Sequence, residues 1–196
     1  MKKERKTSGA AVFMYSTIAL TAVIATVFLF LYYAEIYKNS VTFWIGVVSF
    51  TVLYHFGLRI FMGEATKRFD FDYNHPRFKE RTFEKKLYKW LRVRKWKDKV
   101  LTFDTEAYNF KNRSLDQLAT TMTKSETDHW INEIISVTSI FLALVFGYWQ
   151  AFIVSAVVAM IFDAQFIVVQ RYNRPIVLRL MDRLNRRKSP RQKSRV

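Results

Sequence analysis

A carboxylate and an imidazole stand close together in the middle of the chain. Glu126 and His129 are three residues apart, and Glu133 follows after four more. In a helix this spacing places the three side chains along a single stripe. A carboxylate beside an imidazole orients the ring and raises its proton affinity, as a histidine general base requires. The stripe therefore indicates either a catalytic pair of His129 with Glu126 or an ordinary solvated helix face.

A second polar group follows the last apolar run of the chain, where the string Gln-Arg-Tyr-Asn-Arg-Pro occupies positions 170–175. Arginine, asparagine and tyrosine side chains can bind phosphate or carbonyl oxygens through several directed hydrogen bonds. The same string is also typical of a positively charged stop after a membrane span, with an aromatic anchor. Under the first interpretation the candidate binding residues are Arg171, Tyr172, Asn173 and Arg174.

Two charged residues, Arg59 and Asp163, lie within apolar runs. A charge inside a membrane span is costly, so each residue is a candidate for a functional role. In one interpretation the Arg59 guanidinium pairs with the Asp163 carboxylate and holds two helices together. In the other, the two residues line a polar pocket that opens to the cytoplasm. Both interpretations predict contact between the second and the fourth apolar run.

The elements that must position these residues are four apolar blocks in a chain of 196 residues, 51% of them hydrophobic. Since about 20 apolar residues cross a bilayer as a helix, each block can span a membrane. The last two blocks are so close that they predict an antiparallel hairpin, with one long bent helix as the alternative. We therefore expect an all-α, polytopic membrane protein with a single membrane domain over residues 1–196. The predicted spans are about 10–34, 41–62, 131–148 and 151–169.

The charges gather outside these blocks, where 32 Lys and Arg outnumber 16 Asp and Glu. Sixteen basic residues lie in segment 63–130 and ten in 170–196, whereas the link between the first two spans holds only Lys38. Basic loops tend to stay in the cytoplasm, so both termini and the basic segment 63–130 should face it. The net charge of +16 predicts anionic lipids as partners. Because the chain has no Cys, disulfides and thiolate chemistry are excluded.

The basic segment contains an amphipathic pattern between positions 79 and 92, which predicts a helix lying in the membrane interface. Its apolar face carries Phe83, Leu87, Trp90 and Leu91. Beyond Arg92 the apolar stripe rotates, so we expect a break there. A polar loop follows, and a further helix is expected to begin near Ser114. The basic tail 185–196 is expected to be disordered and attracted to anionic lipid.

Five strings between positions 57 and 184 occur in an order and spacing that resemble a known family. They are Gly57-Leu-Arg-Ile60, Phe83-Glu-Lys85, Val93-Arg-Lys-Trp-Lys97, Glu126-x-x-His129-Trp130 and Gln170-Arg-Tyr-Asn-Arg-Pro175. The chain is thus similar to the glycosyl-4,4'-diaponeurosporenoate acyltransferases, small bacterial membrane enzymes of staphyloxanthin-type carotenoid biosynthesis. The resemblance implies an O-acyltransferase of the bacterial cell membrane. Such an enzyme moves a fatty acyl group onto a hydroxyl of a glycosylated carotenoid or similar glycolipid at the cytoplasmic face.

The resemblance also implies roles for the candidate residues. His129 would deprotonate the acceptor hydroxyl, and Glu126 would orient the imidazole ring. The donor would be acyl-CoA or an acyl carrier protein, with no other cofactor and no metal. Residues that would bind the donor or the oxyanion are Arg171, Asn173 and Arg174. Lys95 and Lys97 would attract an anionic donor, and Trp96 would lie in the membrane interface beside them.

A non-catalytic membrane adaptor explains the charge and the spans equally well. Its basic cytoplasmic surface would bind anionic lipid or a protein partner. The adaptor gives no reason, however, for Glu126 and His129 to accompany the five strings. A nucleic-acid partner is not expected, because the aromatic residues of the basic segment lie on an apolar helical stripe and not on an open stacking platform.

Overall fold

The computed structural model describes residues 9–100, 108 and 112–193. All regular elements among these residues are helices, which confirms the predicted all-α fold. The chain divides into two compact units. The first contains the residues up to 67 together with 131–161, and the second contains 68–130 together with the residues from 162 onward. The single membrane domain expected from the sequence stays a prediction.

Four helical stretches are long and apolar enough to cross a membrane, as predicted. They are Ala11–Tyr33, Ser40–Arg68, Leu115–Phe146 and Trp149–Arg187. Large apolar side chains on them are exposed, among them Phe13, Leu20 and Phe30 in the first stretch. Such exposure is expected of helices whose outer surface contacts lipid.

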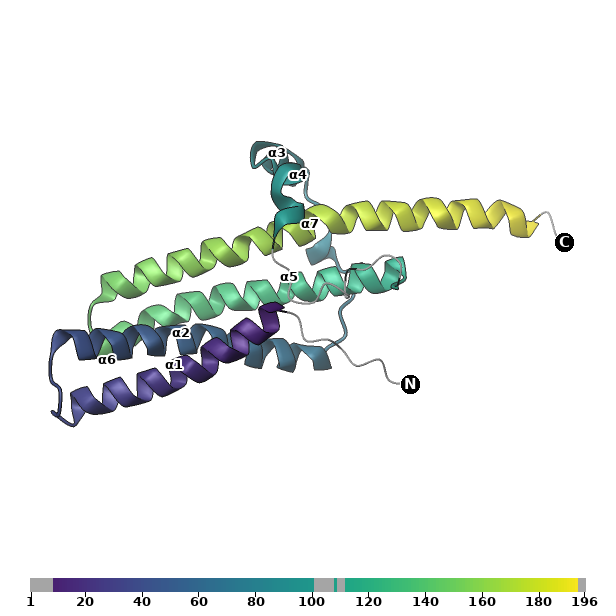
Figure 1. Ribbon diagram of the computed structural model, residues 1–196. Helices are drawn as coiled ribbons and strands as arrows, with labels where there is room; N and C mark the ends of the chain where they lie inside the picture. Colours follow the sequence, from purple (N-terminus) through teal and green to yellow (C-terminus); the bar gives the residue numbers. More distant parts are fainter. Residues whose placement is uncertain (1–8, 101–107, 109–111, 194–196) are drawn as a thin grey trace, which may run out of the picture. The chain divides into compact units, whose positions relative to one another are not determined.

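The first two spans form a helical hairpin in the first unit (Figure 1). Helix α1 covers Gly9–Tyr33, helix α2 covers Ser40–Ala65, and a short helix η1 (Thr66–Arg68) follows. Asn39 is the N-cap of α2, because its side chain accepts a hydrogen bond of 2.9 Å from the backbone N–H of Thr42. Gly46 permits close packing of the two helices, since an added Cβ would lie 2.8 Å from Leu29.

The third and fourth spans are separate helices. Helix α5 (Leu115–Thr138) continues through η5 (Ser139–Leu142) into α6 (Ala143–Phe146), and α7 covers Trp149–Lys193. Gly147 and Tyr148 have φ angles of 74° and 55° and interrupt the helical path. Phe152 of α7 packs back against Leu142 and Phe146 in an apolar cluster of the first unit. The break and this packing confirm the hairpin and exclude one long bent helix.

Helix α7 is longer than the sequence predicted, because it continues through Lys193. The prediction of a disordered tail was therefore wrong for residues 185–193, and 194–196 lie outside the described residues. Val177, Leu180, Met181 and Leu184 continue the apolar helical period beyond the predicted span. The interspersed arginines have high helix propensity, so positive charge alone does not end the helix.

The second unit begins with four short helical elements, one of which is the predicted amphipathic helix. They are η2 (Pro76–Phe78), α3 (Thr82–Trp90), α4 (Val93–Trp96) and η3 (Lys97–Lys99). Helix α3 buries Glu84 and Tyr88, whereas its apolar residues Phe83 and Trp90 are 55% and 76% exposed. An exposed apolar face is what an interfacial helix offers to lipid. Arg92, with a φ of 50°, separates α3 from α4 and confirms the predicted break.

Helix α5 begins where the sequence predicted a helix near Ser114. The Ser114 hydroxyl accepts from the backbone N–H of Gln117, and the Gln117 side chain accepts from the backbone N–H of Ser114. This reciprocal pair is a capping box, which fixes the start of the helix. In the second unit, α5 and α7 share an apolar core of Leu118, Ala119, Met122 and Val177. The core holds together the two helices that carry the candidate site.

Candidate active site

The candidate general base, His129 on α5, has an acidic partner on α7. Its Nδ1 lies 2.8 Å from Oδ1 of Asp163. The Asp163 residue is buried, with 1% of its surface exposed. The ring of Phe166 stacks on the imidazole at a centroid distance of 4.4 Å and an angle of 5°. A buried carboxylate and a stacked ring thus fix the orientation of His129 from two sides.

The second ring nitrogen of His129, Nε2, is not the one bonded to Asp163. Because Nδ1 faces the Asp163 carboxylate, Nε2 is the nitrogen directed away from this partner. The His129 side chain is 19% exposed, so the ring is accessible from one side. A histidine held through one nitrogen by a carboxylate can take a proton on the other, as general bases do.

Glu126 has partners other than the histidine that the sequence suggested. Its Oε1 accepts a hydrogen bond of 2.7 Å from Arg171, and its Oε2 accepts one of 2.5 Å from Arg174. Both the Glu126 and the Arg174 residues are buried, with 0% and 1% of their surface exposed. In the structure the carboxylate that orients His129 is therefore that of Asp163, and Glu126 binds two guanidinium groups.

These contacts extend into an arginine–glutamate network, defined here as Glu84, Glu126, Arg171 and Arg174. Arg171 donates from Nε to the Glu84 carboxylate at 2.9 Å, so one guanidinium bridges glutamates of α3 and α5. Arg174 also donates to the backbone carbonyl of Phe78, at 2.6 Å. Buried charges are tolerated only when they are paired and hydrogen-bonded, which these contacts provide. The network joins α3, α5 and α7.

The phenol of Tyr88 completes the network at α3. Its hydroxyl donates a hydrogen bond of 2.9 Å to Oε2 of Glu84. Burial, and then the hydrogen bond to the Glu84 carboxylate, raise the pKa of Tyr88 above its ordinary value of 10.0. The ring of Tyr172 meets Tyr88 edge to face, with centroids 5.5 Å apart. Tyr172, a predicted binding residue, thus contacts the network through the ring of Tyr88.

Four further candidate residues, Lys95, Trp96, Lys97 and Asn173, also belong to the second unit. Trp96 donates from its indole nitrogen to the Leu91 carbonyl at 2.9 Å. Lys97 pairs with Asp98 at 2.7 Å. Lys95 is exposed and Asn173 is half-buried. The structure therefore places Lys95, Trp96 and Lys97 together on α4 and at the start of η3, as their sequence spacing requires.

Arg59 lies in the first unit, where it donates a hydrogen bond of 3.1 Å to the hydroxyl of Ser136. Asp163 belongs to the second unit and has His129 as a partner. The predicted ion pair between Arg59 and Asp163, and the alternative of a shared polar pocket, stay predictions.

A groove of about 320 Å³ has in its wall Phe166, the residue whose ring stacks on His129. It is lined by Trp96, Lys99, Val100, Phe162, Gln165 and Phe166. All six belong to the second unit. Phe166 therefore contacts the candidate base and also forms part of the groove wall.

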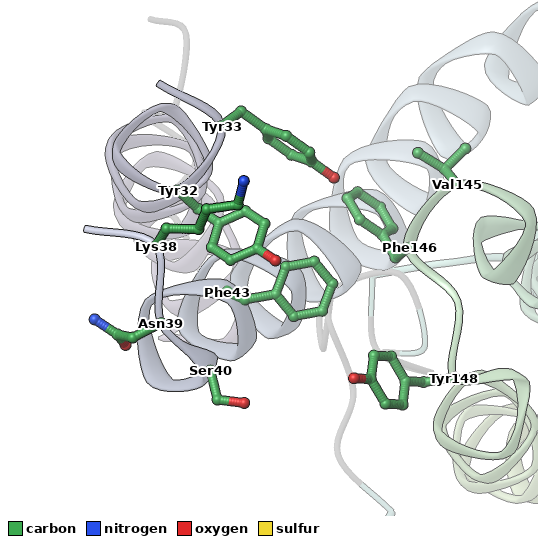
Figure 2. A pocket seen from close by; sticks show the side chains of 9 residues that line it. All are labelled: Tyr32, Tyr33, Lys38, Asn39, Ser40, Phe43, Val145, Phe146 and Tyr148. Carbon is green, nitrogen blue, oxygen red and sulfur yellow. The ribbon is translucent and has the colours of Figure 1, made fainter. Parts of the chain in front are cut away.

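A second cavity, of about 380 Å³, lies in the first unit at the loop between α1 and α2 and the turn before α7 (Figure 2). It is lined by Tyr32, Tyr33, Lys38, Asn39, Ser40, Phe43, Val145, Phe146 and Tyr148. Its described lining contains no histidine or acidic residue. The cavity therefore offers no carboxylate–imidazole pair for general-base chemistry.

The candidate site also falls inside the region that matches a known family. The model of the glycosyl-4,4'-diaponeurosporenoate acyltransferase family matches residues 74–183, more than half of the chain. This range includes His129, Asp163 and all four residues of the arginine–glutamate network. No curated protein and no solved structure matches the chain. On the family match, this four-span helical chain belongs to the glycosyl-4,4'-diaponeurosporenoate acyltransferase family.

Proposed function

We propose that the protein is a membrane O-acyltransferase that moves a fatty acyl group onto a hydroxyl of a glycosylated carotenoid or similar glycolipid. The observation that carries this proposal is the pairing of His129 with the buried Asp163 at 2.8 Å. The pair provides an oriented base with a free nitrogen, and the family match supplies the reaction class.

The transfer then proceeds directly from donor to acceptor. His129 takes the proton of the acceptor hydroxyl while the hydroxyl oxygen attacks the carbonyl carbon of an acyl thioester. The new carbon–oxygen ester bond forms and the carbon–sulfur bond breaks. The imidazolium of His129 returns its proton to the departing thiolate, so the products are an ester and a free thiol. Asp163 stabilises the imidazolium while it exists.

The donor is an anionic thioester, either acyl-CoA or an acidic acyl carrier protein. The lysines at positions 95, 97 and 99 offer positive charge beside Trp96 for such a donor. The count of basic residues favours the cytoplasmic face for this segment, where a soluble donor meets a bilayer-bound acceptor. Both termini lie on that face in this proposal.

The arginine–glutamate network has a positioning role in this proposal. The guanidinium groups of Arg171 and Arg174 are paired with the carboxylates of Glu84 and Glu126, so their positive charge is already balanced without a donor. The network instead holds the interfacial helix α3 against α5. Its α5 residue, Glu126, lies three positions before His129. Oxyanion binding by Asn173 stays a prediction.

The proposal is tested by acyl transfer with the purified full chain in lipid nanodiscs. The chain is given radiolabelled palmitoyl-CoA or palmitoyl acyl carrier protein and a glycosylated carotenoid, and the ester is identified by mass spectrometry. We expect label in the glycosylated acceptor and none in the same carotenoid without its sugar. If neither donor gives an ester while the chain binds strongly to anionic vesicles, the adaptor function is correct and the acyltransferase proposal is wrong.

A further inference from the structure

The groove that Phe166 lines has the apolar walls that an acyl chain requires. Its walls are the aromatic rings of Trp96, Phe162 and Phe166, the isopropyl group of Val100 and the aliphatic part of Lys99. Its volume of about 320 Å³ lies at the lower end of the range for small-ligand pockets. Binding of an apolar chain in the groove would remove the apolar surface of these walls from water, which is favourable.

The walls of the groove are fixed by contacts within the second unit. The Trp96 indole is held by its hydrogen bond to the Leu91 carbonyl. Phe162 meets Phe166 edge to face at a centroid distance of 5.2 Å, and Phe166 stacks on His129. Three rings, those of Phe162, Phe166 and His129, therefore form one continuous series from the groove to the candidate base. Phe162 is nevertheless 51% exposed, so this series has room for a further apolar group.

The charge at the groove fits one end of a thioester donor. Lys99 lines the groove, and Lys97 lies within two residues of it in η3. The acidic residue of η3, Asp98, already pairs with Lys97. An apolar chain whose other end carries phosphates matches this arrangement of rings and ammonium groups. A neutral lipid tail would make no use of the lysines.

We propose that this groove binds the fatty acyl chain of the donor, so that the thioester carbonyl lies next to His129. This inference rests on the proposed function and adds the element that selects the length of the acyl chain. Trp96, Phe162 and Gln165 contact the chain, whereas Lys99 binds the anionic part of the donor.

Chain-length selectivity tests the groove. Gln165→Trp fills it, and Ala164→Trp adds the same side chain at an exposed neighbouring position that does not line it. We expect the ratio of transfer rates for 16-carbon and 10-carbon acyl-CoA to fall about tenfold in Gln165→Trp, because overpacking excludes the longer chain. The ratio is expected to stay within about twofold of the wild type in Ala164→Trp. Equal ratios in both variants would overturn the inference.

The opposite change gives a second pair of variants. Phe162→Ala widens the groove, and Ile161→Ala removes a neighbouring exposed apolar side chain of α7 that does not line it. We expect the ratio to shift toward longer donors by about threefold in Phe162→Ala only, because one apolar wall is lost. A shift of the same size in Ile161→Ala would contradict the groove, since lipid contact alone would then explain the effect.

Photolabelling separates failure of the groove from failure of the proposed function. Acyl-CoA with a diazirine near the chain terminus is cross-linked to the full chain in nanodiscs, and the labelled peptides are identified. We expect label in peptides that contain 96–100 or 162–166, and loss of label with excess palmitoyl-CoA. Label there without any acyl transfer would overturn the proposed function and keep the groove. Normal transfer with label only elsewhere, or label that palmitoyl-CoA does not displace, would overturn the groove.

Discussion

Two carboxylates buried on neighbouring helices of the second unit have opposite partners. Asp163 of α7 binds the imidazole of His129, whose other nitrogen stays available. Glu126 of α5 binds two guanidinium groups, one of which also binds Glu84. Both carboxylates belong to residues with 1% exposure or less. Burial is therefore the same, and the partners alone distinguish the two sites.

In the proposed function, this difference separates the reactive pair from a structural network. Every charge of the arginine–glutamate network is balanced by an opposite charge, and a buried network of this kind stabilises only as a whole. In the pair of His129 and Asp163, by contrast, only Nδ1 of the imidazole is bonded to the carboxylate, and the His129 side chain is 19% exposed. We therefore expect changes at the pair to lower catalysis more than stability, and changes in the network to lower stability first.

The largest effect is expected at the base. His129→Ala should lower the acyl transfer rate by about 10³-fold or more, because it removes general-base catalysis. The thermal unfolding midpoint should fall by less than in the network, since the ring is partly exposed. His75→Ala is the matched control, because His75 is exposed and its contacts are local ones within η2. Radiolabelled transfer assays measure the rates, and a normal rate in His129→Ala would show that another residue is the base.

The next effect is expected in the network. Glu126→Gln keeps the shape of the side chain but leaves Arg174 buried without its carboxylate partner, which costs about 3–5 kcal/mol. For a chain of this size the unfolding midpoint should fall by about 10 °C. Thermal unfolding of the full chain in detergent, followed by far-UV circular dichroism, measures this change.

The control for this substitution lies on the same helix. Asp128 pairs with Lys124 at 2.6 Å, with both side chains about a quarter exposed. Asp128→Asn should therefore change the stability by less than about 1 kcal/mol. If Glu126→Gln abolishes transfer with an unchanged unfolding midpoint, Glu126 acts in the chemistry and the contrast between the two carboxylates is wrong.

A smaller effect is expected at the partner of the base. Asp163→Asn removes the charge that stabilises the imidazolium, so kcat should fall by about 10²-fold while KM stays nearly constant. Asp163→Glu should recover part of the rate, because it restores the charge with a longer side chain. Steady-state kinetics at several donor concentrations measures both constants. A fall confined to KM would instead place Asp163 in substrate binding.

The spans and the interfacial helix were predictable because they depend on local patterns. Long apolar runs bounded by charges predict membrane helices whatever their neighbours are. The apolar faces at Phe83 and Trp90 depend only on helical period. The break at Arg92, where φ is positive, was predictable because the apolar stripe of the sequence rotates beyond this residue.

The partners of the candidate residues were not predictable in this way. His129 and Asp163 are 34 positions apart, and only the packing of α5 against α7 brings them together. The spacing of Glu126 and His129 correctly places both on one side of α5. It cannot tell that Arg171 and Arg174 of α7 meet the first, while Asp163 meets the second. Helix packing, which no local spacing encodes, decides which carboxylate orients the ring.

Glu84 shows which signal the sequence does offer. It lies in the string Phe83-Glu84-Lys85 and is the acidic residue in the first turn of α3. On an amphipathic helix it stands off the apolar face, among lysines that are exposed. A single acid on a basic helical face is a candidate for pairing with a buried arginine, and the structure gives Arg171 as its partner.

The smallest effect concerns the edge of the network, where Tyr88 donates to Glu84. Tyr88→Phe should lower stability by about 1 kcal/mol at neutral pH, because one buried hydrogen bond is lost.

The pKa of Tyr88 is raised in the folded chain, so the folded state holds this proton more tightly than the unfolded one. Its contribution is thus complete below about pH 10 and declines as the pH rises further. The difference in unfolding midpoint between wild type and Tyr88→Phe should therefore stay constant up to about pH 10 and be smaller at about pH 11 than at about pH 9. Tyr33→Phe, at an exposed position of α1, should show no such difference at either pH. A difference for Tyr88→Phe that grows with pH would mean that the phenol ionises more readily in the folded chain, and Tyr88 would then belong with the reactive site.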